Sequence, residues 1–142
     1  MKNLAVSLAF VLLAACSDRS SLDDVQSVTP GDKYVLSVEE IKQLTGPARD
    51  GDAKALFSLI QYYTLVDSDL DKRIYWQRIA AEHGNIVSML NLSLSLGTRG
   101  SSKDCEEALL WIGKVEGSTK SQKWLRSADL NRQSIIETCK AG

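Results

Sequence analysis

The stretch GDAKALFSLIQYYTLVDSDLDKRIYWQRIAAEHGN (residues 51–85) is followed directly by IVSMLNLSLSLGTRGSSKDCEEALLWIGKVEG (residues 86–117), and the two share one pattern. Leu59 and Leu92 take equivalent places 33 residues apart, and Trp76 and Trp111 are 35 residues apart. A period of this length, with two amphipathic segments in each copy, is typical of stacked pairs of helices. The repeat therefore predicts an all-α fold.

The first copy is expected to form two helices. Their apolar positions recur at steps of three and four, first at Ala53, Ala55, Leu56, Leu59, Ile60 and Tyr63, and then at Leu70, Ile74, Trp76, Ile79, Ala80 and His83. This spacing places an apolar stripe on one face of each helix. Asp69 is the expected N-cap of the second helix. Gly84 is expected to end it, because glycine adopts a left-handed conformation at no steric cost.

The second copy repeats this arrangement. Its first helix carries Val87, Leu90, Leu92, Leu94 and Leu96, with Gly97 as the expected stop. Its second helix is expected to begin at Ser101, Ser102 or Asp104, and it carries Ala108, Leu109, Trp111, Ile112 and Val115. Since Trp76 and Trp111 occupy equivalent positions, both are expected to pack in the core.

These residues resemble a known repeat. The set Ala53-Lys54-Ala55, Leu59, Tyr63, Asp69, Trp76, Ala80-Ala81 and Gly84-Asn85 is similar to a Sel1-like repeat, a relative of the tetratricopeptide repeat, and the second copy matches at Asp104, Ala108, Leu109 and Trp111. The resemblance covers about half of the chain and implies a short α-solenoid of about two helix-turn-helix repeats. Ile60 and Arg73 depart from the family pattern, which has smaller residues there.

Segments on both sides of the repeats are expected to cap them, so that the domain spans residues 37–142. Ser37 and Glu40 have the spacing of a capping box and open a short helix through Leu44, which Gly46-Pro47 is expected to break. After Gly117, apolar residues from Trp124 to Cys139 predict a C-terminal capping helix, either continuous or broken near residues 127–129. A short stack of repeats requires such covers at its exposed ends.

The first 15 residues are expected to form a cleaved lipoprotein signal peptide. Lys2 precedes an apolar run from Leu4 to Ala15 that is too short to cross a bilayer. Leu13-Ala14-Ala15-Cys16 resembles a bacterial lipobox, which implies that Cys16 carries the lipid. An ordinary signal peptide followed by a chance cysteine is the alternative. Ser17 follows the cysteine, and by resemblance to lipoprotein sorting this implies the outer membrane, with the domain facing the periplasm.

Residues 16–36 are rich in serine and aspartate, and they are expected to form a flexible tether because so few apolar residues cannot build a core. Without residues 1–15 the chain keeps 16 basic and 18 acidic residues. The basic residues do not cluster as a nucleic-acid binder requires, and the sparse group between Lys120 and Arg126 is expected to be a solvated helix face. Nucleic acid is therefore not an expected partner.

The other two cysteines are expected to pair in an oxidising compartment. Cys105 lies at the start of the last repeat helix and Cys139 at the end of the C-terminal helix. If these helices pack antiparallel, the two cysteines meet and can form a disulfide. Two buried free thiols are the alternative.

No catalytic device, metal site or cofactor site is evident in the sequence. His83 is the only histidine, and its place before Gly84 fits a side chain that caps helix carbonyls. The run Asp67-Ser68-Asp69-Leu70-Asp71 begins like a calcium loop, but Lys72 stands where that loop requires glycine, so helix capping is the better interpretation. The protein is expected not to be an enzyme.

The resemblance also implies a binding surface, since the first helix of each such repeat lines a concave face. Tyr63 aligns with a buried repeat position, so Tyr62 is expected to be exposed. The residues expected to contact a partner are Lys54, Ser58, Gln61, Tyr62, Leu65, Asn91 and Ser95, continued by Val87 and Leu94. An ordinary solvated face is the alternative interpretation.

The resemblance to repeat lipoproteins implies a function in binding a protein partner. We expect an immunity protein that neutralises a toxin or secretion-system effector acting in the periplasm. An adaptor in envelope assembly or envelope-stress signalling is the main alternative. A hydrolase with an unusual site is a further alternative, and it would require His83.

Overall fold

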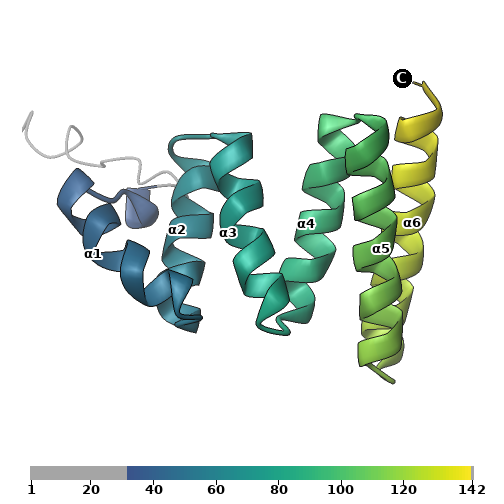
Figure 1. The fold of residues 1–142 in the computed structure, drawn as a ribbon, viewed down its shortest axis with the longest axis horizontal. Coiled ribbons are helices and arrows are strands. Elements are labelled where there is room, and N and C mark those ends of the chain that lie inside the picture. Colours follow the sequence, from purple (N-terminus) through teal and green to yellow (C-terminus); the bar gives the residue numbers. More distant parts are fainter. Residues whose placement is uncertain (1–31, 142) are drawn as a thin grey trace, which may run out of the picture.

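The computed structural model describes residues 32–141, and in this range the chain forms six α-helices and no strand (Figure 1). A short 3-10 helix, η1, precedes them at Asp32–Tyr34. The α-helices are α1 (Val38–Arg49), α2 (Ala53–Leu65), α3 (Leu70–Glu82), α4 (Ile86–Arg99), α5 (Ser102–Ser118) and α6 (Gln122–Ala141). The predicted all-α helical repeat arrangement is confirmed.

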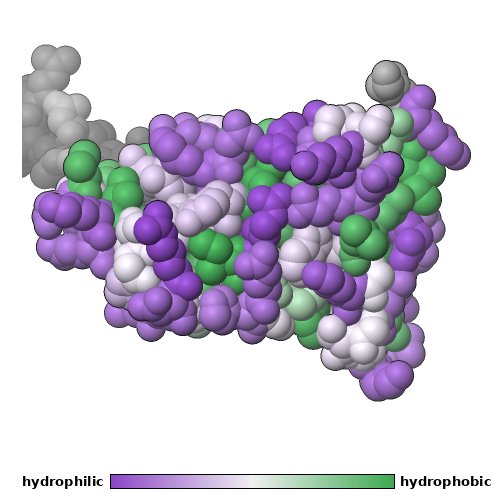
Figure 2. Space-filling model, viewed as in Figure 1, coloured by the Kyte–Doolittle hydropathy of each residue, from purple (hydrophilic) through white to green (hydrophobic). Residues whose placement is uncertain are grey.

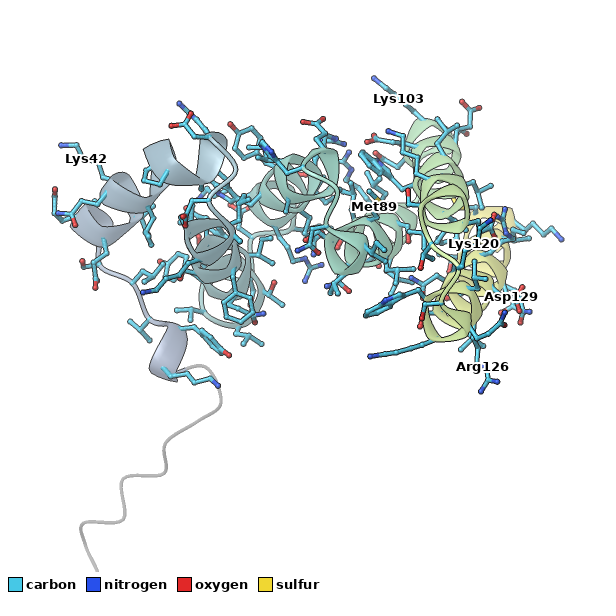
Figure 3. The ribbon with its side chains drawn as sticks, turned by 90° about the horizontal axis from the view of Figure 1, so that it is seen from below. Lys42, Met89, Lys103, Lys120, Arg126 and Asp129 are labelled. Carbon is cyan, nitrogen blue, oxygen red and sulfur yellow. A yellow bond between two sulfur atoms is a disulfide. The ribbon has the colours of Figure 1, made fainter. Side chains whose placement is uncertain are left out.

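The helices form two staggered layers. In Figure 3, α1 and α3 lie on one side and α2 and α4 on the other, and α5 and α6 overlap at the C-terminal end of the stack. Successive helices pack against each other along the chain, and α4 also contacts α6. Among the described helices, α2 and α4 share no backbone contact, because α3 lies between them.

Side-chain caps fix where the repeat helices begin. Asp69 accepts a hydrogen bond from the backbone N–H of Lys72 at 2.9 Å, and Ser101 accepts one from Asp104 at 3.1 Å. The predicted N-cap at Asp69 is confirmed, and Ser101 is the N-cap among the three residues considered for α5. Gly84 follows α3 with φ +83°, as predicted for its end.

The predicted break of helix α1 at Gly46-Pro47 does not occur. The helix runs to Arg49, and the left-handed turn comes at Gly51, which has φ +91° and donates its N–H to the Ala48 carbonyl at 3.1 Å. Proline removes one N–H from the helix ladder. Ala48 is fully buried against α2 and α3 residues, and this packing holds the last turn in helical form.

Helix α4 likewise continues past Gly97, so the predicted stop there is wrong. The helix ends at Arg99, and Gly100 adopts φ +74° and donates its N–H to the Leu96 carbonyl at 3.1 Å. Gly97 is buried beneath Ile135 of α6. Gly97 has no side chain, and this allows α4 and α6 to pack closely; it does not form a turn.

Helix α6 is continuous, so the unbroken form of the predicted C-terminal cap is correct. Ala128 and Ile135 are buried against the repeats. The helix runs antiparallel to α5, and Cys105 at the start of α5 is joined by a disulfide to Cys139 near the end of α6, with their Cα atoms 6.1 Å apart. The predicted pairing is present in the structure.

The apolar residues form two cores that share α3. Trp76 and Ala80 of α3 pack with residues of α1 and α2, while Ile74 and Ala81 of the same helix pack with α4, α5 and α6. Trp76 and Trp111 are each 5% exposed, which confirms that both are packing residues. Helix α3 therefore joins the two halves of the domain.

Ion pairs tie the repeat helices together. Arg78 of α3 binds Glu107 of α5 through two hydrogen bonds of 2.9 Å. Arg99, at the end of α4, binds both Asp71 of α3 and Asp104 of α5. These contacts fix the stacking of one helix pair on the next.

The predicted signal peptide, residues 1–15, and the lipidation site Cys16 lie outside the described residues. Most of the predicted tether, residues 16–36, lies outside them as well. Its last part is described, and there the Tyr34 ring meets the Phe57 ring of α2 edge to face at 6.0 Å, while Leu36 packs against the first core. The ordered domain therefore begins several residues before Ser37.

Candidate functional site

A groove runs between α2 and α4 on the described surface. It consists of two adjoining cavities of about 470 Å³ and 290 Å³, which share Ile60, Gln61 and Asn91 as lining residues. The larger cavity lies at the N-terminal halves of α2 and α4, and the smaller one at their C-terminal halves. We call this continuous hollow the α2–α4 groove.

The walls of the groove follow from the periodicity of the two helices. On α2 they are formed by residues at steps of three and four, namely Phe57, Ile60, Gln61 and Thr64. On α4 the same steps give Val87, Asn91, Leu94, Ser95 and Thr98. Because such positions share one face of a helix, each helix presents a continuous wall.

The floor of the groove comes from α3. Ala80 and His83 line the larger cavity, and Arg73 and Gln77 line the smaller one. Gln77 is only 4% exposed, and its Oε1 has no hydrogen-bond partner among the described residues; the same holds for Nε of Arg73. A buried polar atom without a partner costs about 1–3 kcal/mol, so the floor holds unmet hydrogen-bonding capacity.

The groove has cationic character. No aspartate or glutamate lines either cavity, whereas Arg73 lines the smaller one. The other two basic residues of α3 differ from Arg73 in this respect, because Lys72 pairs with Asp67 and Asp69, and Arg78 pairs with Glu107. Within residues 32–141, Arg73 has no such carboxylate partner.

Three of the residues predicted to contact a partner meet in the groove. Gln61 of α2 and Asn91 of α4 line both cavities, and Ser95, although 5% exposed, lines the smaller one. Val87 and Leu94, expected on the same face, line its rim with exposed fractions of 47% and 38%. The resemblance-based concave face therefore coincides in part with the α2–α4 groove.

The other predicted contact residues lie elsewhere. Lys54 and Leu65 are exposed, and Ser58 is half-buried, but none of the three lines the groove. Tyr62 is half-buried, packs against the first core and meets the Tyr63 ring edge to face at 5.0 Å. The expectation that Tyr62 is exposed was wrong, because its ring packs against the first core.

Tyr63 belongs to the core, as predicted. Burial raises the pKa of its phenol, so this group stays protonated under ordinary conditions. The ammonium group of Lys72 lies 5.1 Å from the centre of its ring. The ring is thus held by packing and by a cation–π contact at the edge of the first core.

Arg73, Gln77 and Phe57 were not among the predicted site residues. The available signal was the position of Gln77, which falls on the apolar stripe of α3 between Ile74 and Ala81. A polar residue at a buried position requires a partner or a function. Arg73 and Ile60, the two departures from the repeat pattern, both line the groove.

The His83 side chain has a structural setting. Its ring lies so close to Gly51 that a Cβ there would come 2.5 Å from His83 Cε1. The residue is the C-cap of α3. Among residues 32–141, no group of three or more histidine, cysteine, aspartate or glutamate side chains could hold a metal ion.

Figure 2 shows the face of the domain that is seen in Figure 1. Hydrophilic side chains cover most of it, and its hydrophobic areas are small and separate.

In the part of the chain that the structure describes, no helix combines the length and the hydrophobicity needed to cross a membrane.

Searches against protein-family models, curated proteins and solved structures found no match to this chain.

Proposed function

We propose that this chain is a non-catalytic lipoprotein that binds a protein partner through the α2–α4 groove. The observation that supports this most directly is the groove's rim, where Phe57, Val87 and Leu94 are 52%, 47% and 38% exposed beside the amide side chains of Gln61 and Asn91. Protein-binding surfaces combine exposed apolar side chains with hydrogen-bonding groups in this way.

The proposed address follows from the first residues of the chain. The apolar run that ends in Leu13-Ala14-Ala15-Cys16 supports lipidation of Cys16, and Ser17 supports retention at the outer membrane with the domain in the periplasm. Lipid chains hold a protein at a membrane through the hydrophobic effect, at about 0.8 kcal/mol for each buried CH₂. A partner would then have to be present in, or enter, the periplasm.

We propose further that the partner is a toxin, so that the chain acts as its immunity protein. A small anchored binding domain can block an envelope-targeting toxin by covering its active surface. The test is co-expression in a bacterium with each toxin candidate from the neighbouring genes, exported to the periplasm. Growth restored by this chain, together with a stoichiometric complex after purification, is the expected result.

Variants in this test connect protection with the groove. Asn91→Lys places a long charged side chain in the groove, whereas Ser134→Lys introduces a lysine at an exposed position of α6, outside the groove. We expect protection to be lost with the first variant and kept with the second. Recovery of several envelope-assembly proteins, without rescue from any toxin, would instead identify an adaptor.

A further inference from the structure

We infer that the occupant of the α2–α4 groove is an extended acidic segment of the partner protein. In this arrangement Arg73 pairs with a carboxylate of the segment, and Gln77 bonds to one of its backbone N–H groups. This inference rests on the proposed function, because it describes the chemistry of the partner that the groove would bind.

Charge complementarity gives the sign of the occupant. Arg73 lines the groove without a described carboxylate partner, although the neighbouring bases of α3, Lys72 and Arg78, are each paired. No acidic side chain lines the groove to neutralise it. The chain as a whole carries a formal net charge of −1, so this cationic groove is a local feature. A partner carboxylate supplies the missing counter-charge.

The unpaired atoms of the floor indicate a polypeptide rather than a simple anion. Nε of Arg73 is a donor without an acceptor, and Oε1 of Gln77 is an acceptor without a donor. Both atoms are covered in the free domain, so the two side chains must turn toward the groove to reach an occupant. An isolated ionised carboxylate offers acceptors only. An aspartate or glutamate within a peptide offers both, because its carboxylate accepts and its own backbone N–H donates.

The shape of the groove fits an extended segment. It follows α4 from Val87 to Thr98, a rise of roughly 16 Å at 1.5 Å per residue. This length accommodates about five residues of extended chain at roughly 3.3 Å each. Phe57, Val87 and Leu94 at the rim can cover apolar side chains that alternate with the acidic ones.

The N-terminal segment of this chain is also acidic, since it contains Asp18, Asp23 and Asp24. Under the proposed function, however, residues 16–36 join the domain to its lipid anchor. We therefore assign the groove to a partner, and the experiment treats the chain's own segment as a competing occupant.

The experiment selects random 12-residue peptides displayed on phage against the purified chain. Enriched peptides are synthesised with a fluorescent label, and their affinities are measured by anisotropy for the unmodified chain and for Arg73→Gln, Arg73→Lys, Gln77→Leu and Lys72→Gln. Thermal melting of every variant establishes that it is folded. Lys72→Gln is the matched control, because it removes the same charge from the neighbouring position outside the groove.

The expected result is enrichment of peptides that contain aspartate or glutamate. Their binding should weaken about tenfold or more in Arg73→Gln, as for the loss of one partner of a desolvated charge pair, and less in Arg73→Lys. Gln77→Leu should also weaken binding, and Lys72→Gln should leave it within about twofold of the unmodified chain.

Three outcomes would overturn the inference. The first is failure to enrich acidic peptides, and the second is binding to a folded Arg73→Gln variant at unchanged affinity. The third is a synthetic peptide of residues 17–31 that binds more tightly than the selected peptides, which would make the chain its own ligand. If acidic peptides bind the chain but none of the toxin candidates does, only the immunity function is refuted. If a toxin binds Arg73→Gln as tightly as it binds the unmodified chain, only the proposed pairing in the groove is refuted.

Discussion

Gly97 of α4 lies directly beneath Ile135 of α6, so that a Cβ on Gly97 would come 3.1 Å from Ile135 Cγ1. Ile135 is 2% exposed and has little room to move away. We expect Gly97→Val to lower the free energy of unfolding by about 1–3 kcal/mol through overpacking, measured by urea denaturation. Adding Ile135→Val should recover part of the loss.

Gly113 provides the control for this prediction. It lies on the exposed face of α5, and a Cβ there would meet no atom within 4 Å. Gly113→Val should be neutral or slightly stabilising, since glycine is a poor helix former. If Gly97→Val and Gly113→Val lose equal amounts of stability, then helix propensity, and not the contact with Ile135, explains the effect of the substitution at Gly97.

Asp104 is expected to make the domain sensitive to acid. Hydrogen bonds from Arg99 and then from Ser101 lower the pKa of its carboxyl group from 3.8 to about 2. Because the pKa is lower in the folded state, the stabilisation is complete above about pH 4 and is lost as the pH falls toward 2. We expect it to contribute about 1–2 kcal/mol to the free energy of unfolding, since Arg99 is partly exposed and solvent screens the pair.

Asp104→Asn tests this assignment. We expect the variant to unfold at lower urea concentration at pH 7 and to lose less stability than the unmodified protein between pH 4 and 2. Glu106→Gln, on an exposed position of the same helix, should keep the original pH dependence. An Asp104→Asn variant whose stability falls as steeply with acid would assign the effect to other carboxylates.

The disulfide should stabilise the domain by restricting the unfolded chain. It joins residues 34 apart in sequence, for which the chain-entropy model gives about 3–4 kcal/mol. We expect Cys105→Ser, Cys139→Ser and the double variant to lose similar amounts of stability. Thiol titration of the denatured, unreduced protein should find no free thiol from this pair, and two free thiols would exclude the bond.

Trp76 should be essential to the first core, where it is 5% exposed. Trp76→Ala is expected to cost about 3–5 kcal/mol through loss of buried surface and formation of a cavity, measured by denaturant unfolding. Tyr62→Ala should also lower stability, by a smaller amount, because that ring is half-buried. An unchanged midpoint for Tyr62→Ala would restore its interpretation as a free surface residue.

Lipidation of Cys16 is tested by its removal. Cys16→Ser should move the protein from the membrane fraction to the soluble periplasmic fraction, because the thiol is the proposed point of lipid attachment. Immunoblots of the two fractions measure this change, with Cys105→Ser as the control that leaves the anchor intact. Membrane association of Cys16→Ser would count against the lipobox interpretation.

Local signals in the sequence were sufficient for the helices and most of their ends. The spacing of apolar residues predicted α2 to α5, and Asp69 and Gly84 marked the limits of α3, because caps and amphipathic stripes act within one or two turns. The positions of Cys105 and Cys139 at opposite ends of their helices predicted their pairing on the condition that the two helices pack antiparallel, and the tertiary structure meets that condition.

Only the tertiary structure decided how glycine and proline act at two places. Gly97 resembles a helix stop in sequence, and Gly46-Pro47 resembles a break, but packing of Ile135 on Gly97 and burial of Ala48 keep both helices intact. Such contacts join residues far apart in the chain, and they outweigh local preferences of about 1 kcal/mol for glycine.

The candidate site shows the same division. The resemblance to a two-helix repeat predicted Gln61, Asn91 and Ser95 on one concave face, while helical periodicity by itself relates only Asn91 and Ser95, which share α4. It did not place Arg73 and Gln77 beneath them, because that depends on how α3 packs between α2 and α4. The helices were thus determined by local sequence, whereas the groove was decided by the stacking of α2 and α4 on α3, which contributes to both cores.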